Sequence, residues 1–319
     1  MSDRLLNLIR RCWRQLVGVV LLVLLIGVIG PRVTVATLEA ARLEWLALCA
    51  AMLVLCGLIG AFNLYLLGEF DKIRFRVFCR VFWHAWAVHL VSPGQVGDVA
   101  AISLMMRRHG VSWSASLGRL MIDKVISLLV ISGFALTGYL YLVSTRAALT
   151  DVLGAEWLVF AAACFLAVVV WAMTTHPKRL QKLRELVFSA WSETRLALKE
   201  RARQVGLNCV LTVIKTLLSG SAVWAVFIAL GYSPPYWPSV FLVMSASVVA
   251  YVPVSINGIG TVEAVAIQLF AGLGVSAEAT LLTFIVYRAI ILAVAWIPSA
   301  LMLLLDAEKN DSSRSSPGA

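Results

Sequence analysis

The chain has 319 residues, of which 61% are hydrophobic and only 14% are charged, whereas soluble domains average about 45–50% apolar and about 25% charged residues. The mean hydropathy of +0.90 and several uncharged runs of about twenty residues exclude a soluble globular enzyme and predict an all-α polytopic membrane protein. The net charge of +10 belongs to the loops of such a protein, so it does not indicate nucleic-acid binding.

The first half of the chain, residues 1–150, contains three predicted spans and one broken segment. The spans are expected at 16–30, 45–67 and 120–142. The first span follows several arginines, as a signal peptide does, but Pro31 and Arg32 stand where a cleavage site would be, which favours an uncleaved span. Between the second and third spans, the apolar segment 81–106 is interrupted by the turn sequence Ser92–Gly97.

The second half, residues 151–307, repeats this order, and the polar tail 308–319 is expected to be disordered and cytoplasmic. The spans are expected at 157–173, 205–230 and 281–305. The shorter apolar segment 240–273 is interrupted by Ser255–Thr261, another turn sequence rich in glycine. Together the two halves predict about six full spans and two broken segments.

Internal similarity relates the two halves. Sliding the sequence along itself aligns Gly94–Leu128 with Gly258–Leu292, including a Gly-Val-Ser triplet in both. Backbone that is not helical survives at membrane depth only inside protein or beside a wet cavity. We therefore interpret both broken segments as re-entrant hairpins, with two ordinary spans and a tight surface loop as the alternative. Hairpins that return to their own side leave each half with an odd number of crossings, which makes the halves an inverted repeat.

Positive charge predicts the orientation of these spans. All but six of the 27 lysine and arginine residues fall on one side of this topology, and the positive-inside rule makes that side cytoplasmic. Only Arg32, Arg42 and Arg146 fall on the other side. We therefore expect a multi-pass protein of a bacterial-type inner membrane with both termini in the cytoplasm.

Six ionisable residues lie in or beside the apolar segments, where each costs about 2.5–3.5 kcal/mol at the bilayer centre and is functional by default. They are Asp98, Asp123, Lys124, Lys215, Glu263 and Arg288. Asp98 and Glu263 follow the glycines of the two hairpins, and Lys124 and Arg288 occupy equivalent places in the next spans. Either the acids and bases pair and lock the halves together, or they line a midplane pocket where cations and helix N-termini bind an anionic headgroup.

The hairpin turns complete the candidate site, and no catalytic residue is predicted. The turn residues are Pro93, Gly94, Gly97, Asn257, Gly258 and Gly260. The six cysteines show no metal-ligand spacing, and no phosphate-binding GxxxxGK[ST] motif occurs. We therefore expect no metal and no cofactor.

Two segments, Pro93–Leu129 and Pro253–Leu292, resemble the signature regions of the lysylphosphatidylglycerol-synthase transmembrane-region family, also called flippase-like domain proteins. The Pro-Gly-x-x-Gly-Glu/Asp pattern of that family reads Pro93–Asp98 here. The Gly-Gly-x-Gly-x-x-Glu pattern reads Asn257–Glu263, with asparagine in place of the first glycine. The other family positions correspond to Asp123, Lys124 and Arg288.

The resemblance implies movement of a lipid or lipid-linked molecule across the membrane. It does not imply lysine transfer, because the soluble aminoacyl-transferase domain of two-domain relatives has no counterpart in this sequence. Two arginines that are frequent in the family are replaced here by Ala101 and Val262. If those arginines grip a phosphate in relatives, this protein either uses Lys124, Lys215 and Arg288 instead or handles another headgroup.

The sequence thus predicts translocation of an anionic phospholipid or a polyprenyl-linked glycolipid without ATP hydrolysis, either downhill or coupled to an ion. Asp98 or Glu263 could then carry a proton. The alternatives are an integral-membrane enzyme that uses Asp98, Asp123 or Glu263 as acid or base, and an accessory subunit of a glycosyltransferase or synthase. The expected partner in every case is a membrane lipid or lipid-linked substrate, not nucleic acid.

Overall fold

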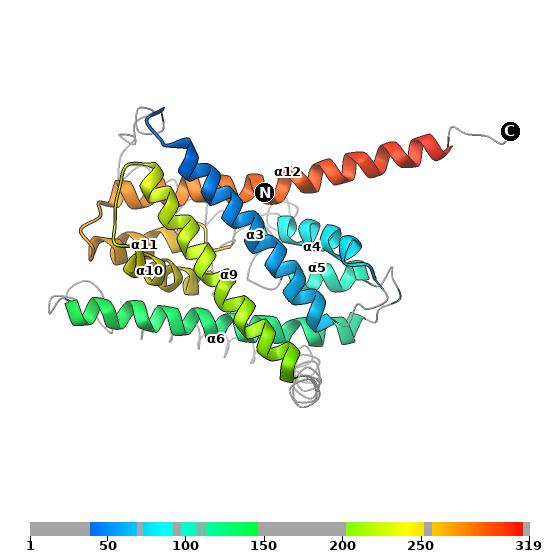
Figure 1. Ribbon diagram of the computed structural model, residues 1–319, viewed down its shortest axis with the longest axis horizontal. Coiled ribbons are helices and arrows are strands. Elements are labelled where there is room, and N and C mark those ends of the chain that lie inside the picture. The colour runs from blue at the N-terminus through cyan, green and yellow to red at the C-terminus, as the bar shows by residue number, and fades with distance from the viewer. Residues whose placement is uncertain are drawn as a thin grey trace, which may run out of the picture.

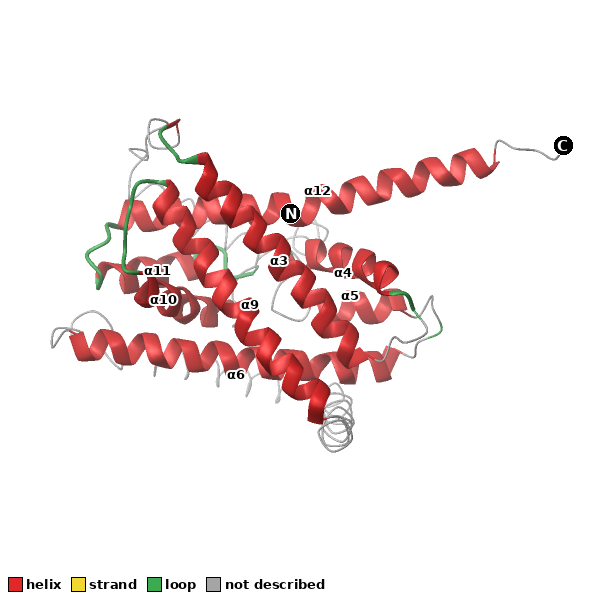
Figure 2. Ribbon diagram, in the orientation of Figure 1, coloured by secondary structure: helices red, strands yellow, loops and turns green. Residues whose placement is uncertain are grey.

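The computed structural model describes residues 39–68, 73–91, 97–106, 110, 113–145, 202–251 and 257–314, and the predicted spans at 16–30 and 157–173 lie outside them. Within these ranges all regular structure is helical (Figure 2). The helices are α3 (Leu43–Gly68), α4 (Phe75–Leu90), α5 (Gly97–Met106), α6 (Trp113–Thr145), α9 (Ala202–Ala229), α10 (Tyr236–Val248) with the 3-10 turn Val249–Tyr251, α11 (Thr261–Ala271) and α12 (Ala277–Arg314).

Four of the described helices are long and apolar enough to cross a membrane. They are Leu43–Gly68, Leu120–Thr145, Ala202–Ala229 and Ala277–Leu304. Each coincides with a span predicted from hydropathy, so the prediction of an all-helical, multi-pass membrane protein is confirmed. Large apolar side chains such as Leu129 and Ile297 are 68% and 65% exposed, as expected for positions that face lipid.

Short helices take the place of the two broken segments. Helix α4 packs against α5, and α10 packs against α11. The structure corrects the start of the first segment, which was predicted at residue 81, because α4 begins at Phe75. Its first turns are amphipathic: Arg76 and Arg80 are exposed while Phe78 and Phe82 are buried.

The last helix is longer than the sequence predicted. The backbone of α12 is helical through Arg314, which corrects the prediction of disorder for residues 308–314. Leucine, alanine, glutamate and lysine dominate residues 300–309, and these are strong helix formers. No proline follows until Pro317, so nothing ends the helix earlier.

The contacts between helices have an internal symmetry. If α3, α4, α5 and α6 are exchanged with α9, α10, α11 and α12, the α3–α9 contact maps onto itself and each other contact between these α-helices maps onto another observed contact. For example, α4 packs on α12 as α10 packs on α6, and α5 packs on α6 as α11 packs on α12. Figure 1 shows the α4–α5 and α10–α11 pairs on opposite sides of the adjoining helices α3 and α9.

The two central helices, α3 and α9, run antiparallel. Hydrogen bonds join the Arg42 N–H to the Ala229 carbonyl (2.9 Å), the Cys56 thiol to the Lys215 carbonyl (3.5 Å) and the Asn63 amide to the Asn208 carbonyl (3.4 Å). The partners on α9 descend as those on α3 ascend, which sets the opposite directions (Figure 1). The two central helices, which correspond to each other under the exchange, therefore point in opposite directions.

Candidate functional site

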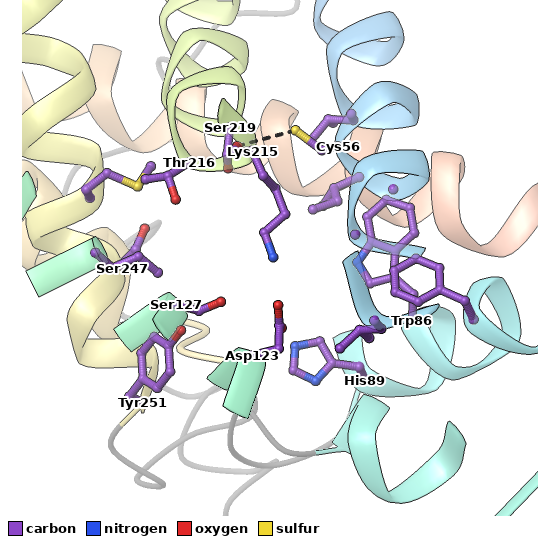
Figure 3. Close-up of a pocket in the computed structure, with 18 of the residues that line it drawn as sticks. Cys56, Trp86, His89, Asp123, Ser127, Lys215, Thr216, Ser219, Ser247 and Tyr251 are labelled. Atoms are coloured by element: carbon purple, nitrogen blue, oxygen red, sulfur yellow. Dashed lines mark hydrogen bonds between the residues drawn. The ribbon is translucent and has the colours of Figure 1, made fainter. Parts of the chain in front are cut away.

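A cavity of about 250 Å³ lies where α3, α4, α6, α9, α10 and α12 meet (Figure 3). A second chamber of about 240 Å³ shares Trp86, Ser219 and Tyr287 with the first and extends to Asn257 and Arg288. Each chamber is smaller than the roughly 300–1,000 Å³ of pockets for drug-sized ligands. The chambers therefore suit a headgroup, not a whole lipid.

The polar lining of the first chamber comes from one face of each helix. Lys215 and Ser219 lie four residues apart on α9, and Asp123 and Ser127 lie four residues apart on α6. Residues at this spacing stand one above the other on a helix. The polar face thus meets the cavity, while the other faces of these helices carry the apolar side chains that contact lipid or neighbouring helices.

Asp123 is held by neutral groups. Its side chain is 3% exposed, and its Oδ1 accepts hydrogen bonds from the amides of Asn63 (3.2 Å) and Asn208 (3.1 Å). The Asn63 amide also donates to the Thr212 hydroxyl (3.0 Å), and all three of these partners are completely buried. This arrangement fixes the carboxylate without a cation, so its negative charge is not cancelled by the groups that position it.

Lys215 enters the same cavity from the opposite wall. Figure 3 shows its ammonium group and the Asp123 carboxylate pointing toward one another across the open space. Within the part of the chain that the structure describes, Lys215 has no carboxylate oxygen within 4.0 Å of its ammonium nitrogen. Hydroxyl groups of Thr216, Ser219 and Ser247 line the chamber with it. The cation is therefore available to an anionic ligand.

Arg288, in the second chamber, is paired. Its Nε donates to Oε1 of Glu263, which is completely buried, and its Nη1 donates to the Asn257 carbonyl (3.3 Å). The other Glu263 oxygen accepts the N–H of Gly260 (2.7 Å) at the start of α11. Glu263 and Arg288 thus form an acid–base pair, but both belong to the second half, so this pair does not join the two halves.

Glycine shapes the turn that carries this pair. Gly258 and Gly260 have φ angles of +71° and +81°, a region that L side chains rarely adopt. A Cβ on Gly258 would fall against Val262 and lie 3.0 Å from the Ala250 Cβ. The turn therefore needs glycine both for its conformation and for close packing over α11.

Some of the predicted site residues line the two chambers and others do not. Asp123, Lys215 and Arg288 line the chambers, and Glu263 reaches them through Arg288. Lys124 is half-buried and is not among the residues lining either chamber, because consecutive residues project about 100° apart around a helix. Asp98 lies in the first turn of α5, but its side chain is outside the described part.

Only some of the predicted turn residues lie in the described part of the chain. Asn257, Gly258 and Gly260 form the described turn before α11, whereas Gly97 is the first residue of α5. Pro93 and Gly94 lie outside the described residues.

Sequence reasoning missed the amides that hold Asp123. Their signal was present on α9, where polar residues recur with helical periodicity in an apolar span. They are Asn208, Thr212, Lys215, Thr216 and Ser219. Asn63 offered a weaker signal, a single amide in the apolar segment 45–67. Among the described residues, no three or more His, Cys, Asp or Glu side chains are placed to hold a metal ion.

Comparison with known families identifies a relationship over most of the chain. The family model described as the lysylphosphatidylglycerol synthase transmembrane region matches residues 15–299. The match contains both pairs of short helices and every described residue that lines the two chambers. Neither the curated proteins nor the solved structures contain a match to the chain.

Proposed function

Because the chain belongs to the family of the lysylphosphatidylglycerol synthase transmembrane region, we propose that it moves a phosphate-bearing lipid headgroup between the leaflets of a bacterial-type inner membrane. The two substrate classes predicted from the sequence, an anionic phospholipid and a polyprenyl-linked glycolipid, share that phosphate. The headgroup occupies the connected chambers while the acyl or prenyl chains stay in lipid. The observation that carries this proposal is Lys215, whose ammonium group faces the cavity with no ion-pair partner among the described residues.

The walls around Lys215 match the chemistry of a phosphate. Ser127 and Ser219 line the first chamber with hydroxyl groups that can donate to phosphate oxygens. The Ser247 hydroxyl donates to the Val243 carbonyl (2.7 Å) and can accept a hydrogen bond from a ligand. Hydrogen bonds to an ionised group are roughly twice as strong as neutral ones. A headgroup that leaves water can thus replace its hydration by one ammonium and several hydroxyl groups.

Inverted halves provide a route for exchange between leaflets. The antiparallel packing of α3 on α9 and the exchange symmetry of the contacts support an inverted repeat, and in such repeats the substrate lies near the midplane between halves that rock against each other. In this proposal α4–α5 and α10–α11 are re-entrant hairpins, and both termini are cytoplasmic. Exchange is downhill or ion-coupled and does not hydrolyse ATP.

Reconstitution of the purified protein tests this function. Liposomes would contain phospholipids labelled on an acyl chain, so that the headgroup is natural, and a membrane-impermeant quencher would report movement of the label between leaflets. We expect exchange above that of protein-free liposomes, with every recovered lipid chemically unchanged by mass spectrometry. A new lipid product would contradict the proposal and indicate an enzyme. Neither exchange nor product would also contradict it and would favour an accessory role.

A further inference from the structure

We propose that the cavity selects a zwitterionic headgroup in which a phosphate and a primary ammonium are joined by a short linker, as in phosphoethanolamine. This inference rests on the proposed function and narrows its phosphate-bearing lipid to one that carries its own positive charge, in place of the anionic phospholipid or polyprenyl-linked glycolipid that the sequence predicted. Lys215 and Asp123 face one cavity, and neither forms an ion pair with any residue that the structure describes.

Asp123 is prepared for a cationic ligand. The amides of Asn63 and Asn208, both completely buried, donate to its Oδ1, and no described residue donates to its Oδ2. These neutral donors hold the Asp123 carboxylate in one orientation but do not balance its negative charge, which a cationic group of the ligand could balance. Glu263, by contrast, is paired with the cation of Arg288.

Charge balance in the chambers favours a ligand with no net charge. Among the described lysine, arginine, aspartate and glutamate side chains that line the chambers or pair with a lining residue, two are positive and two are negative: Lys215, Arg288, Asp123 and Glu263. A ligand with only a phosphate would satisfy Lys215 but would place its charge beside Asp123. A phosphate with an attached ammonium satisfies both, which is the usual form of electrostatic complementarity.

The residues that line the first chamber also differ between the side of Lys215 and the side of Asp123. Figure 3 places Thr216 and Ser219 beside Lys215, on the side that would hold the phosphate. Figure 3 places His89 beside Asp123, with Trp86 farther along the same side of the chamber. An indole face attracts a cation within about 6 Å of its centre. The ammonium of the ligand would therefore meet a carboxylate and an aromatic ring, while its phosphate meets an ammonium and two hydroxyl groups.

Binding of two short-chain lipids tests this proposal. The purified full chain would be titrated with dihexanoyl-phosphatidylethanolamine and, separately, with dihexanoyl-phosphatidylglycerol, and the dissociation constants would be compared. We expect phosphatidylethanolamine to bind at least about tenfold more tightly, the factor that corresponds to about 1.4 kcal/mol. In Asp123→Asn, which keeps an oxygen for the two amides and loses the charge, the ratio should fall to within about twofold. Glu278→Gln, which removes an exposed carboxylate from α12, should leave the ratio unchanged.

Equal binding of the two lipids to the unaltered protein, or a tenfold preference that survives in Asp123→Asn, would overturn the proposal. If Asp123→Asn does not fold, the ratio for the unaltered protein decides alone. The exchange assay separates this inference from the function on which it rests. Selective binding without exchange of any lipid would contradict the function only, whereas exchange of phosphatidylglycerol together with equal binding would contradict the selectivity only.

Discussion

Among the described residues, two cationic side chains, Lys215 and Arg288, line the two chambers, and their surroundings differ. Arg288 is bonded to a completely buried carboxylate and to a backbone carbonyl at a glycine-rich turn. Lys215 faces an open space lined by hydroxyl groups and has no ion pair within the described ranges. A paired charge belongs to the fold, because removing its partner leaves an uncompensated buried charge. Lys215 has no such partner among the described residues, which is consistent with our proposal that it binds a ligand.

The largest effect is expected where the paired cation is removed. Arg288→Ala leaves Glu263 buried and uncompensated, and breaking such a pair from one side costs about 3–5 kcal/mol. The free energy of unfolding, measured by denaturing-detergent titration of the purified protein, should fall by that amount. The double variant Glu263→Gln/Arg288→Gln should recover most of the loss, because it leaves no buried charge. A stable Arg288→Ala protein would show that the pair does not hold the fold.

A smaller loss is expected where the support of Asp123 is weakened. Asn63→Ala removes one of the two amides that donate to the Asp123 carboxylate. It also removes the hydrogen bond from Asn63 to the Thr212 hydroxyl. Leaving a buried polar group unsatisfied costs about 1–3 kcal/mol, so the same titration should report a loss in that range. An unchanged free energy of unfolding would mean that the amide cradle is not needed to keep Asp123 in the cavity.

The turn beside the paired cation offers a third comparison. Gly258→Ala places a side chain at a φ of +71°, which costs about 1–2 kcal/mol for an L residue. We expect a loss of at least that size in the free energy of unfolding. Gly133→Ala is the matched control, because a Cβ there meets nothing within 4 Å in the exposed middle of α6. If both variants lost equal stability, the turn would not be the cause.

The smallest change in stability is expected at the unpaired cation. Lys215→Met keeps a side chain of similar length and removes a charge that no described carboxylate balances. Substitutions that break no cap, pair or packing contact usually stay within about 0.5 kcal/mol, so the free energy of unfolding should be unchanged or slightly higher. A loss as large as that of Arg288→Ala would place Lys215 in the scaffold instead.

Hydropathy and turn residues were enough to predict much of this fold. The four described spans follow from uncharged apolar runs, and the turn at Asn257–Gly260 follows from residues that tolerate positive φ. The pairing of Glu263 with Arg288 was one of two interpretations, because opposite charges near one turn can either pair or bind a ligand. Asp123 lines the first chamber and Lys124 does not, because the two side chains project from different faces of α6. Which face of α6 meets the chamber is set by the packing of this helix against α3 and α9. The amides of Asn63 and Asn208 meet across two helices, which no local pattern encodes.

The central claim is that Lys215 serves the ligand and not the fold, and lipid exchange by Lys215→Met tests it most directly. The variant would be reconstituted beside the unaltered protein and beside Arg203→Gln, which removes an exposed positive charge from the same helix. The account predicts that Lys215→Met loses more than about tenfold in exchange rate, the value of one charge-assisted hydrogen bond, while Arg203→Gln exchanges lipid normally. Normal exchange by Lys215→Met would contradict the account.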